Sequence, residues 1–330
     1  MKFHLSLKRV PVNILFLIIT MLFIFSLLFS GQKIRLREVK IEESEEIFFA
    51  KPIDIESSGS RVFILDSQES TVRIFSPTGK FLGSLGRYGR GPGEFIGSND
   101  MSVSENEVAL IDREGRRIQF FDHEGSYRGE FKIGFIAHRL LSLSEDKFII
   151  SSLPRVFDKN VFLLHGFNRQ GKEIFQAEKV SSSGNGALDF FLFQHHLVRV
   201  NGQPVLFKNF GPELAFFLNE NGQRTRVLKI DPALPVLQFQ PPLSRPKKVQ
   251  ASFWSVSAYK DRIYLVLQGR MEDGDLGPSR QVAVLNLEGK LEGVIDFPVP
   301  VYRLTRIDNR FFIIDDSARL RLFELIEEKF

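Results

Sequence analysis

"RVFILDSQESTVRIFSPTGKFLGSLG", residues 61–86, contains three short apolar runs separated by polar turns. The runs at 61–66 and 71–75 are rich in Val, Ile and Phe, which favour β-strands. The second run ends in Ser-Pro-Thr-Gly, where a short polar side chain can bond to its own backbone and glycine can adopt a positive φ. With a third run at 81–85, the stretch predicts three consecutive strands joined by tight turns.

The same pattern recurs along the chain. Turns of the form hydrophobe, Ser/Asp/Asn, two residues, Gly end at Gly79, Gly125, Gly171, Gly222 and Gly289. A period of roughly 40 to 50 residues is that of four-stranded propeller blades. A sixth unit at 309–330 lacks a third strand, and the alternating segment 33–43 has no unit of its own. We therefore predict an all-β, six-bladed β-propeller over residues 33–330, closed by an N-terminal strand.

This organisation resembles six-bladed propellers of the NHL-repeat kind. The resemblance covers residues 33–330 and is strongest at 61–86 and 106–131, where Asp66 and Asp112 end the second strand of a unit. Asp315 matches in the sixth unit, whereas the third, fourth and fifth units have other residues there. The resemblance implies the fold and leaves the function open.

The N-terminus has the pattern of a membrane signal. A basic leader, residues 1–9, precedes the uncharged run at 10–30, which is long enough to cross about 30 Å of hydrocarbon. We predict an uncleaved transmembrane helix at 10–30, with the leader in the cytoplasm and the propeller on the periplasmic or extracellular side. A cleaved signal segment is the alternative.

Composition excludes several functions. The chain has no cysteine, so thiolate zinc sites, disulfides and cysteine nucleophiles are excluded. Residues 1–40 carry a net charge of +6, and the remainder carries about −2, so no nucleic-acid partner is expected. The sequence also lacks the G-x-S-x-G, H-E-x-x-H and Walker motifs. Most of the 34 phenylalanines are interpreted as packing between blades.

The glycine-rich stretch "GRYGRGPGEF", residues 86–95, is predicted to be a crossover between two blades. A phosphate loop needs a following helix and a Gly-Lys-Ser/Thr sequence, and both are missing from the sequence here. Loops on a rigid scaffold often carry function. Arg87, Tyr88 and Arg90 are therefore candidate partner contacts.

Further candidates come from aligning the repeats. The alignment places the following residues at equivalent inner-strand positions near the channel mouth, with Arg139 and Trp254 beside them: Asp54, Asp100, Leu140, His196, Ser255 and Arg303. Trp254 could equally serve packing. His195 and His196 are adjacent on a strand and should point to opposite faces, which disfavours one metal ion bound by both.

Loop lengths indicate where a partner binds. The long segments at 180–195, 231–253 and 268–280 are expected at one face of the ring. We predict a non-catalytic module that binds a protein, peptide or glycan on that face, without a cofactor. One alternative is a hydrolase or lyase with a divalent metal at the channel mouth, which needs at least three ligands from Asp54, Asp100, His196 and their neighbours. Another alternative is a structural subunit of an envelope complex.

Overall fold

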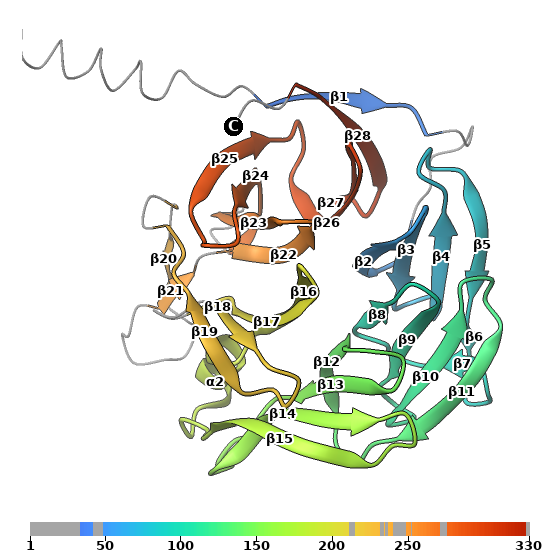
Figure 1. Cartoon of the computed structure of the whole chain (residues 1–330), viewed down its shortest axis with the longest axis vertical. Coiled ribbons are helices and arrows are strands. Elements are labelled where there is room, and N and C mark those ends of the chain that lie inside the picture. Colours follow the sequence, from blue (N-terminus) through green and yellow to red (C-terminus); the bar gives the residue numbers. More distant parts are fainter. Residues whose placement is uncertain are drawn as a thin grey trace, which may run out of the picture.

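The computed structural model describes residues 34–41, 49–210, 215–231, 234, 237–239, 249–251, 253–270 and 276–327. These residues form a ring of six four-stranded sheets, which confirms the predicted six-bladed propeller (Figure 1). The predicted leader and membrane helix lie outside the described residues. Within the described ranges, no helix is both long and apolar enough to cross a membrane.

The strands of each blade are antiparallel and follow one another outward from the centre (Figure 1). Blade 1 contains β2 (Pro52–Ser58), β3 (Arg61–Asp66), β4 (Thr71–Phe75) and β5 (Phe81–Leu85). Blade 2 contains β8 (Met101–Val103), β9 (Glu107–Asp112), β10 (Arg117–Asp122) and β11 (Tyr127–Lys132). Blade 3 contains β12 (Ala137–Ser142), β13 (Lys147–Ser152), β14 (Val161–Asn168) and β15 (Glu173–Val180).

The second half of the ring repeats this order. Blade 4 contains β16 (His195–Val200), β17 (Gln203–Lys208), β18 (Ala215–Leu218) and β19 (Arg224–Leu228). Blade 5 contains β22 (Phe253–Tyr259), β23 (Arg262–Arg270), β24 (Leu276–Leu285) and β25 (Leu291–Asp296). Blade 6 contains β26 (Val301–Ile307), β27 (Arg310–Asp315), β28 (Leu320–Glu327) and β1 (Arg35–Val39). Between blades lie helix α2 (Gly186–Leu192) and the pair β20 (Leu237–Phe239) and β21 (Val249–Ala251).

Strand β1 closes the ring, as predicted. It runs antiparallel to β28, with Leu36 opposite Leu325 and Val39 opposite Leu322. Leu36 packs against the core between blades 5 and 6, and Val39 packs against the core between blades 6 and 1. The edge of the last blade is thus covered by a strand from the other end of the propeller.

Phenylalanine fills the space between blades. Side chains alternate along each strand, so both faces of every blade contribute to a core shared with a neighbour. Among the described residues, the twelve largest fully buried side chains are eleven phenylalanines and one tyrosine. The interpretation of phenylalanine as packing is therefore confirmed for these positions.

The repeated turns have the predicted chemistry. The Asp122 Oδ1 atom accepts hydrogen bonds from the Glu124 and Ser126 amides, at 3.1 and 2.7 Å, and Gly125 has a φ of 94°. A Cβ atom on Gly125 would lie 2.8 Å from the Ser84 carbonyl oxygen in the preceding blade. Glycine is thus required here both by conformation and by close packing between blades.

The glycine-rich stretch 86–95 is a crossover from blade 1 to blade 2. Its two short strands, β6 (Arg87–Tyr88) and β7 (Glu94–Phe95), pair in parallel. The Arg117 Nη2 atom of β10 donates to the carbonyl oxygens of Arg90, Gly91 and Glu94 at 2.9 to 3.0 Å. An arginine of the next blade therefore holds the crossover in place.

Candidate functional site

The inner strands are kinked at a shared position. In β2, β12, β22 and β26, the pairing with the second strand skips one residue. The four skipped residues are Ile53, His138, Trp254 and Tyr302. Such a β-bulge redirects side chains locally. The residue that follows each bulge is Asp54, Arg139, Ser255 or Arg303.

The bulges correct one part of the repeat alignment. Arg139 pairs with Ser151, which lies one residue before the end of β13, just as Asp54 pairs with Leu65 near the end of β3. The counterpart of Asp54 in blade 3 is therefore Arg139, and the alignment that placed Leu140 there is wrong by one residue. Because β2 carries the same bulge, the offset comes from the alignment of the sequence and is revealed by the pairing register.

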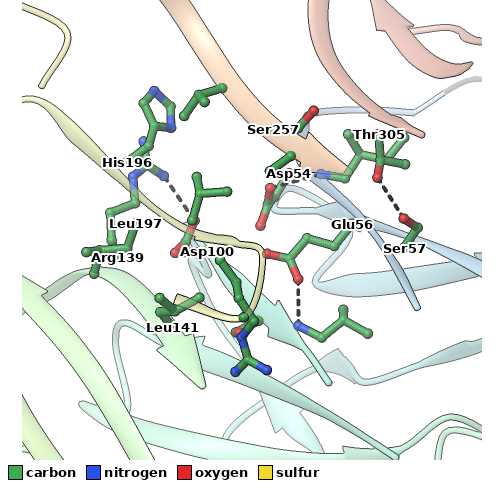
Figure 2. Close-up of a pocket in the computed structure, with 18 of the residues that line it drawn as sticks. Asp54, Glu56, Ser57, Asp100, Arg139, Leu141, His196, Leu197, Ser257 and Thr305 are labelled. Carbon is green, nitrogen blue, oxygen red and sulfur yellow. Dashed lines mark hydrogen bonds and ion pairs between the residues drawn. The ribbon is translucent and has the colours of Figure 1, made fainter. Parts of the chain in front are cut away.

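A channel cavity of about 380 Å³ lies between the inner strands. The carboxylates of Asp54, Glu56 and Asp100 point toward its middle (Figure 2). Each of them accepts a hydrogen bond from the next inner strand: Asp54 from the Met101 amide, Glu56 from the Val103 amide and Asp100 from the Leu140 amide, at 3.2, 2.6 and 2.7 Å. These acids thus connect neighbouring blades around the channel.

Burial dominates the electrostatics of this cavity. It raises the pKa of Asp54, raises that of Glu56 well above its usual range and raises that of Asp100 to about 7. The Arg139 Nη1 atom, 3.1 Å from Asp100 Oδ1, partly offsets the effect (Figure 2). Burial also lowers the pKa of His196 well below its usual range, so its ring is neutral at pH 7. The channel cavity is therefore less charged than its sequence suggests.

The two adjacent histidines occupy different surroundings. His195 is 1% exposed, and its ring nitrogens lie 2.7 Å from the Phe193 carbonyl oxygen and 2.7 Å from Ser151 Oγ. The neighbouring His196 lines the channel cavity instead. Over the described residues, no group of three or more His, Asp or Glu side chains is placed to hold one metal ion.

A second hollow, the loop-face cavity, has a volume of about 880 Å³. It lies at the end of the ring that holds the inter-blade connections and the loops between second and third strands, which we call the loop face. Its described lining contains one carboxylate, Asp158, and four arginines: Arg113, Arg139, Arg155 and Arg303. These arginines come from the β9–β10 loop, β12, the β13–β14 loop and β26. The cavity is thus rich in positive charge.

Two buried polar atoms in the lining of the loop-face cavity have no hydrogen-bond partner among the described residues: Asn99 Oδ1 and His138 Nε2. The Asn99 amide nitrogen is occupied, because it donates to the His138 carbonyl oxygen at 2.8 Å. Burial and the charge of Arg139 lower the pKa of His138 well below its usual range, so its ring is neutral. The Trp254 Nε1 atom, on another bulged residue, is also buried and has no partner in the part of the chain that the structure describes. Unsatisfied buried groups of this kind are uncommon in proteins.

The structure brings only some of the predicted site residues together. Asp54, Asp100 and His196 line the channel cavity, Arg303 lines the loop-face cavity, and Arg139 lines both. The remaining four predicted residues line neither cavity: Arg87, Tyr88, Arg90 and Trp254.

These four residues lie in two environments. The side chains of Arg87 and Arg90 are 78% and 84% exposed, and they pair with Glu94 and Glu114 at 2.9 and 3.7 Å. Tyr88 is 70% exposed. Trp254 packs against the Tyr302 ring, with the ring centres 5.7 Å apart.

The sequence reasoning missed four residues of the loop-face cavity: Asn99, Arg113, His138 and Arg155. Arg113 and Arg155 belong to the second loop of their blades, and this loop lies at the predicted face. Considering the charged residues of every second loop could have identified them, although the loop of Arg155 resembles none of the others in sequence. Asn99 and His138 each precede a predicted residue, but the bulge that turns His138 toward the cavity leaves no signal in the sequence.

Solved structures with the same fold include a candidate exported protein of Bacteroides fragilis NCTC 9343. It is 13% identical, with a TM-score of 0.58 over 90% of this chain and 96% of that one. Virginiamycin B lyase from Staphylococcus aureus is 10% identical, with a TM-score of 0.52 over 89% of this chain and 100% of that one. At these identities the likeness shows the fold alone. No curated protein matches the sequence significantly.

One family is identified by sequence. Its model matches residues 32–222, which include the first four turn glycines and the residues of blades 1 to 3 that line both cavities. The match extends over more than half of the chain, and the protein therefore belongs to the family described as "Domain of unknown function (DUF4934)".

Proposed function

We propose that the protein is a membrane-anchored, extracytoplasmic propeller of the NHL-like kind that binds a protein, peptide or glycan on its loop face and performs no chemistry. The loop-face cavity is the observation that carries this proposal. Its volume of about 880 Å³ lies within the usual range of ligand sites, about 300 to 1,000 Å³. It is formed by loops and bulged strands on a closed ring, which suits preorganised binding.

The location outside the cytoplasm is supported by the uncharged run at 10–30, which follows a basic leader. The similar Bacteroides fragilis structure, described as a candidate exported protein, is consistent with this location. A structural subunit of an envelope complex would be a special case of the same binding role.

A hydrolase or lyase receives less support from the geometry. The carboxylates of Asp54, Glu56 and Asp100 are engaged by backbone amides of neighbouring blades, and burial shifts all three toward the protonated form. Acids used in this way stabilise the channel wall and are poor ligands for a divalent metal. The fold shared with virginiamycin B lyase does not add support, because one fold hosts many functions.

The proposal is tested by affinity purification of the full chain from solubilised membranes. A loop-face variant combines Arg155→Glu with Phe157→Asn, both at exposed positions of the β13–β14 loop. Its control, Asp261→Lys, reverses one exposed charge in the β22–β23 turn at the opposite end of the ring. We expect the parent and the control to retain the same partner and the loop-face variant to lose it. Loss of the partner with the control alone would place binding on the opposite face.

A third variant examines the crossover at 86–95 separately. Replacing Arg87, Tyr88 and Arg90 with Ala removes three exposed side chains that line neither cavity. Surface changes of this kind usually alter stability by less than about 0.5 kcal/mol each. If the crossover contributes to recognition, partner recovery falls while the melting temperature stays the same.

A further inference from the structure

We propose that the loop-face cavity binds an acidic peptide segment, with a carboxylate of the ligand held by arginines and with ligand N–H groups donating to the unpartnered atoms of the wall. This inference rests on the proposed function and specifies its ligand. It follows from three properties of the cavity, which are its excess of arginines over carboxylates, its unpartnered buried polar atoms and its partly apolar lining.

The positive charge is available to a ligand. Arg139 and Arg303 are partly engaged, since their Nε atoms donate to the carbonyl oxygens of His195 and Ile53 at 3.0 and 2.9 Å, and Arg139 also pairs with Asp100. Within the described part of the chain, Arg113 and Arg155 have no ion-pair partner. The Asp158 carboxylate accepts from the Arg155 backbone amide at 2.7 Å, so this acid stabilises its own loop. A planar guanidinium without a partner matches a carboxylate in geometry and charge.

The unpartnered atoms require donors. The carbonyl oxygen Asn99 Oδ1 can only accept, and no described group donates to it. His138 is neutral, and its buried Nε2 atom can accept a further bond when the proton is on Nδ1. A peptide provides a donor at almost every residue of its backbone. Water and sugar hydroxyls can also donate, so the apolar rim decides between a peptide and a sugar.

The rim of the cavity is apolar and exposed. Ile136 lines the cavity and is 46% exposed, whereas Val156 and Phe157, which are 45% and 76% exposed, do not line it but follow the lining residue Arg155 in the β13–β14 loop. Phe157 has a φ of 72°, which is an outlier for a bulky residue, and its amide is held by Ser182 Oγ at 3.1 Å. Strained residues held by their surroundings are typical of ligand-binding sites. Phe135, Leu153 and Phe162 continue the apolar surface into the cavity.

These properties favour a peptide over an acidic sugar. The described wall offers neutral polar partners that would also suit a sugar, but it adds hydrocarbon from Phe135, Ile136, Leu153 and Phe162, for which a sugar has no apolar side chain. A peptide that carries a carboxylate beside an aliphatic or aromatic side chain satisfies both the arginines and this hydrocarbon. Aromatic and apolar anchors surrounded by charge are common in protein interfaces.

The test measures binding of the full chain, purified in detergent, to the labelled peptide GEFEVG. Its twin GQFQVG has the same shape without the carboxylates, and trigalacturonate serves as the acidic sugar. We expect GEFEVG to bind at least tenfold more tightly than GQFQVG and trigalacturonate. Arg113→Gln and Arg155→Gln should each weaken GEFEVG binding at least fivefold. The control Arg128→Gln removes a similarly exposed charge from the outer strand β11 and should leave binding unchanged.

Several results would overturn the inference. Equal binding of GEFEVG and GQFQVG would remove the carboxylate requirement, and tighter binding of trigalacturonate would replace the peptide with an acidic sugar. Weakening by Arg128→Gln equal to that by Arg155→Gln would show non-specific charge attraction. The proposed function fails differently, because it requires that the loop-face variant lose its membrane partner. If the protein still binds its membrane partner through the loop face but does not bind GEFEVG, only the peptide inference is refuted.

Discussion

Arg117 is predicted to stabilise the crossover between blades 1 and 2 more than any exposed ion pair does. Its side chain is 8% exposed, and its Nε and Nη1 atoms lie 2.7 Å from carboxylate oxygens of Asp112 and Glu130. Its Nη2 atom donates to three carbonyl oxygens of the glycine-rich crossover. Arg117→Met keeps a side chain of similar length and removes every one of these donors.

The expected loss can be worked out from these contacts. The Asp112 side chain is 2% exposed, so the substitution leaves a buried carboxylate without its cation, for which losses are typically about 3 to 5 kcal/mol. The amides of Ile96 and Gly115 still donate to Asp112, at 3.2 and 3.1 Å, which favours the lower half of that range. The partly exposed Glu130 adds little. We expect the free energy of unfolding to fall by about 3 to 4 kcal/mol.

Urea unfolding of the parent, Arg117→Met and a matched control measures this loss. The control, Arg128→Met, removes the ion pair with Asp122, in which the arginine side chain is 59% exposed, and should cost less than about 1 kcal/mol. The double variant Arg117→Met with Asp112→Asn should recover part of the stability, because the buried charge is gone. The reasoning is refuted if Arg117→Met costs no more than Arg128→Met.

Three more predictions concern ring closure, turn geometry and pH. A chain that starts at residue 45 lacks β1 and should unfold about 2 to 4 kcal/mol more easily than one that starts at residue 33, as measured by urea unfolding; equal midpoints would show that β1 is only a tether. Gly125→Ala should cost about 2 kcal/mol or more in the same assay, because its Cβ would meet the Ser84 carbonyl oxygen, whereas Gly134→Ala, with open space around it, should cost less than about 0.5 kcal/mol. Burial raises the pKa of Asp100 from 3.8 to about 7, so between these pH values the folded state keeps a proton that the unfolded state releases. The free energy of unfolding of the parent should therefore fall as the pH rises from about 4 through 7. Asp100→Asn should therefore gain stability relative to the parent over that interval, by about 4 kcal/mol at most, and a difference that does not change with pH would contradict the raised pKa.

The propeller fold was predictable because the same turn sequence recurs along the chain. A turn with a capping polar side chain and a glycine needs only a few consecutive residues, so Asp122 and Gly125 could be interpreted from sequence. Ring closure was predictable for a different reason. A sixth unit without an outer strand and a leftover alternating segment have one economical solution, which the pairing of β1 with β28 confirms.

The cavities were predictable only in part, because they depend on where inner strands depart from regular pairing. Aligning repeats by sequence does not reveal the register of strand pairing, and in blade 3 the alignment was displaced by one residue although the bulge before Arg139 recurs before Asp54. The alignment therefore found Arg139 only as a neighbour of Leu140 and missed His138, which the bulge places at the cavity. Arg155 was missed because its loop has no counterpart of similar sequence in the other blades.

The distribution of hydrogen bonds separates the two cavities in function. In the channel cavity, Asp54, Glu56 and Asp100 bond to the backbone of the next blade, so removing a ligand from this cavity would leave the acids satisfied. In the loop-face cavity, Asn99 Oδ1 and His138 Nε2 are satisfied by no described group, although burial makes an unmet bond costly. A protein tolerates such a cost where a ligand supplies the missing partner.

Both cavities share Arg139, which pairs with Asp100 on one side and lines the loop-face cavity on the other, so an anionic ligand should compete with Asp100 for this arginine. Ligand binding should therefore raise the pKa of Asp100 further.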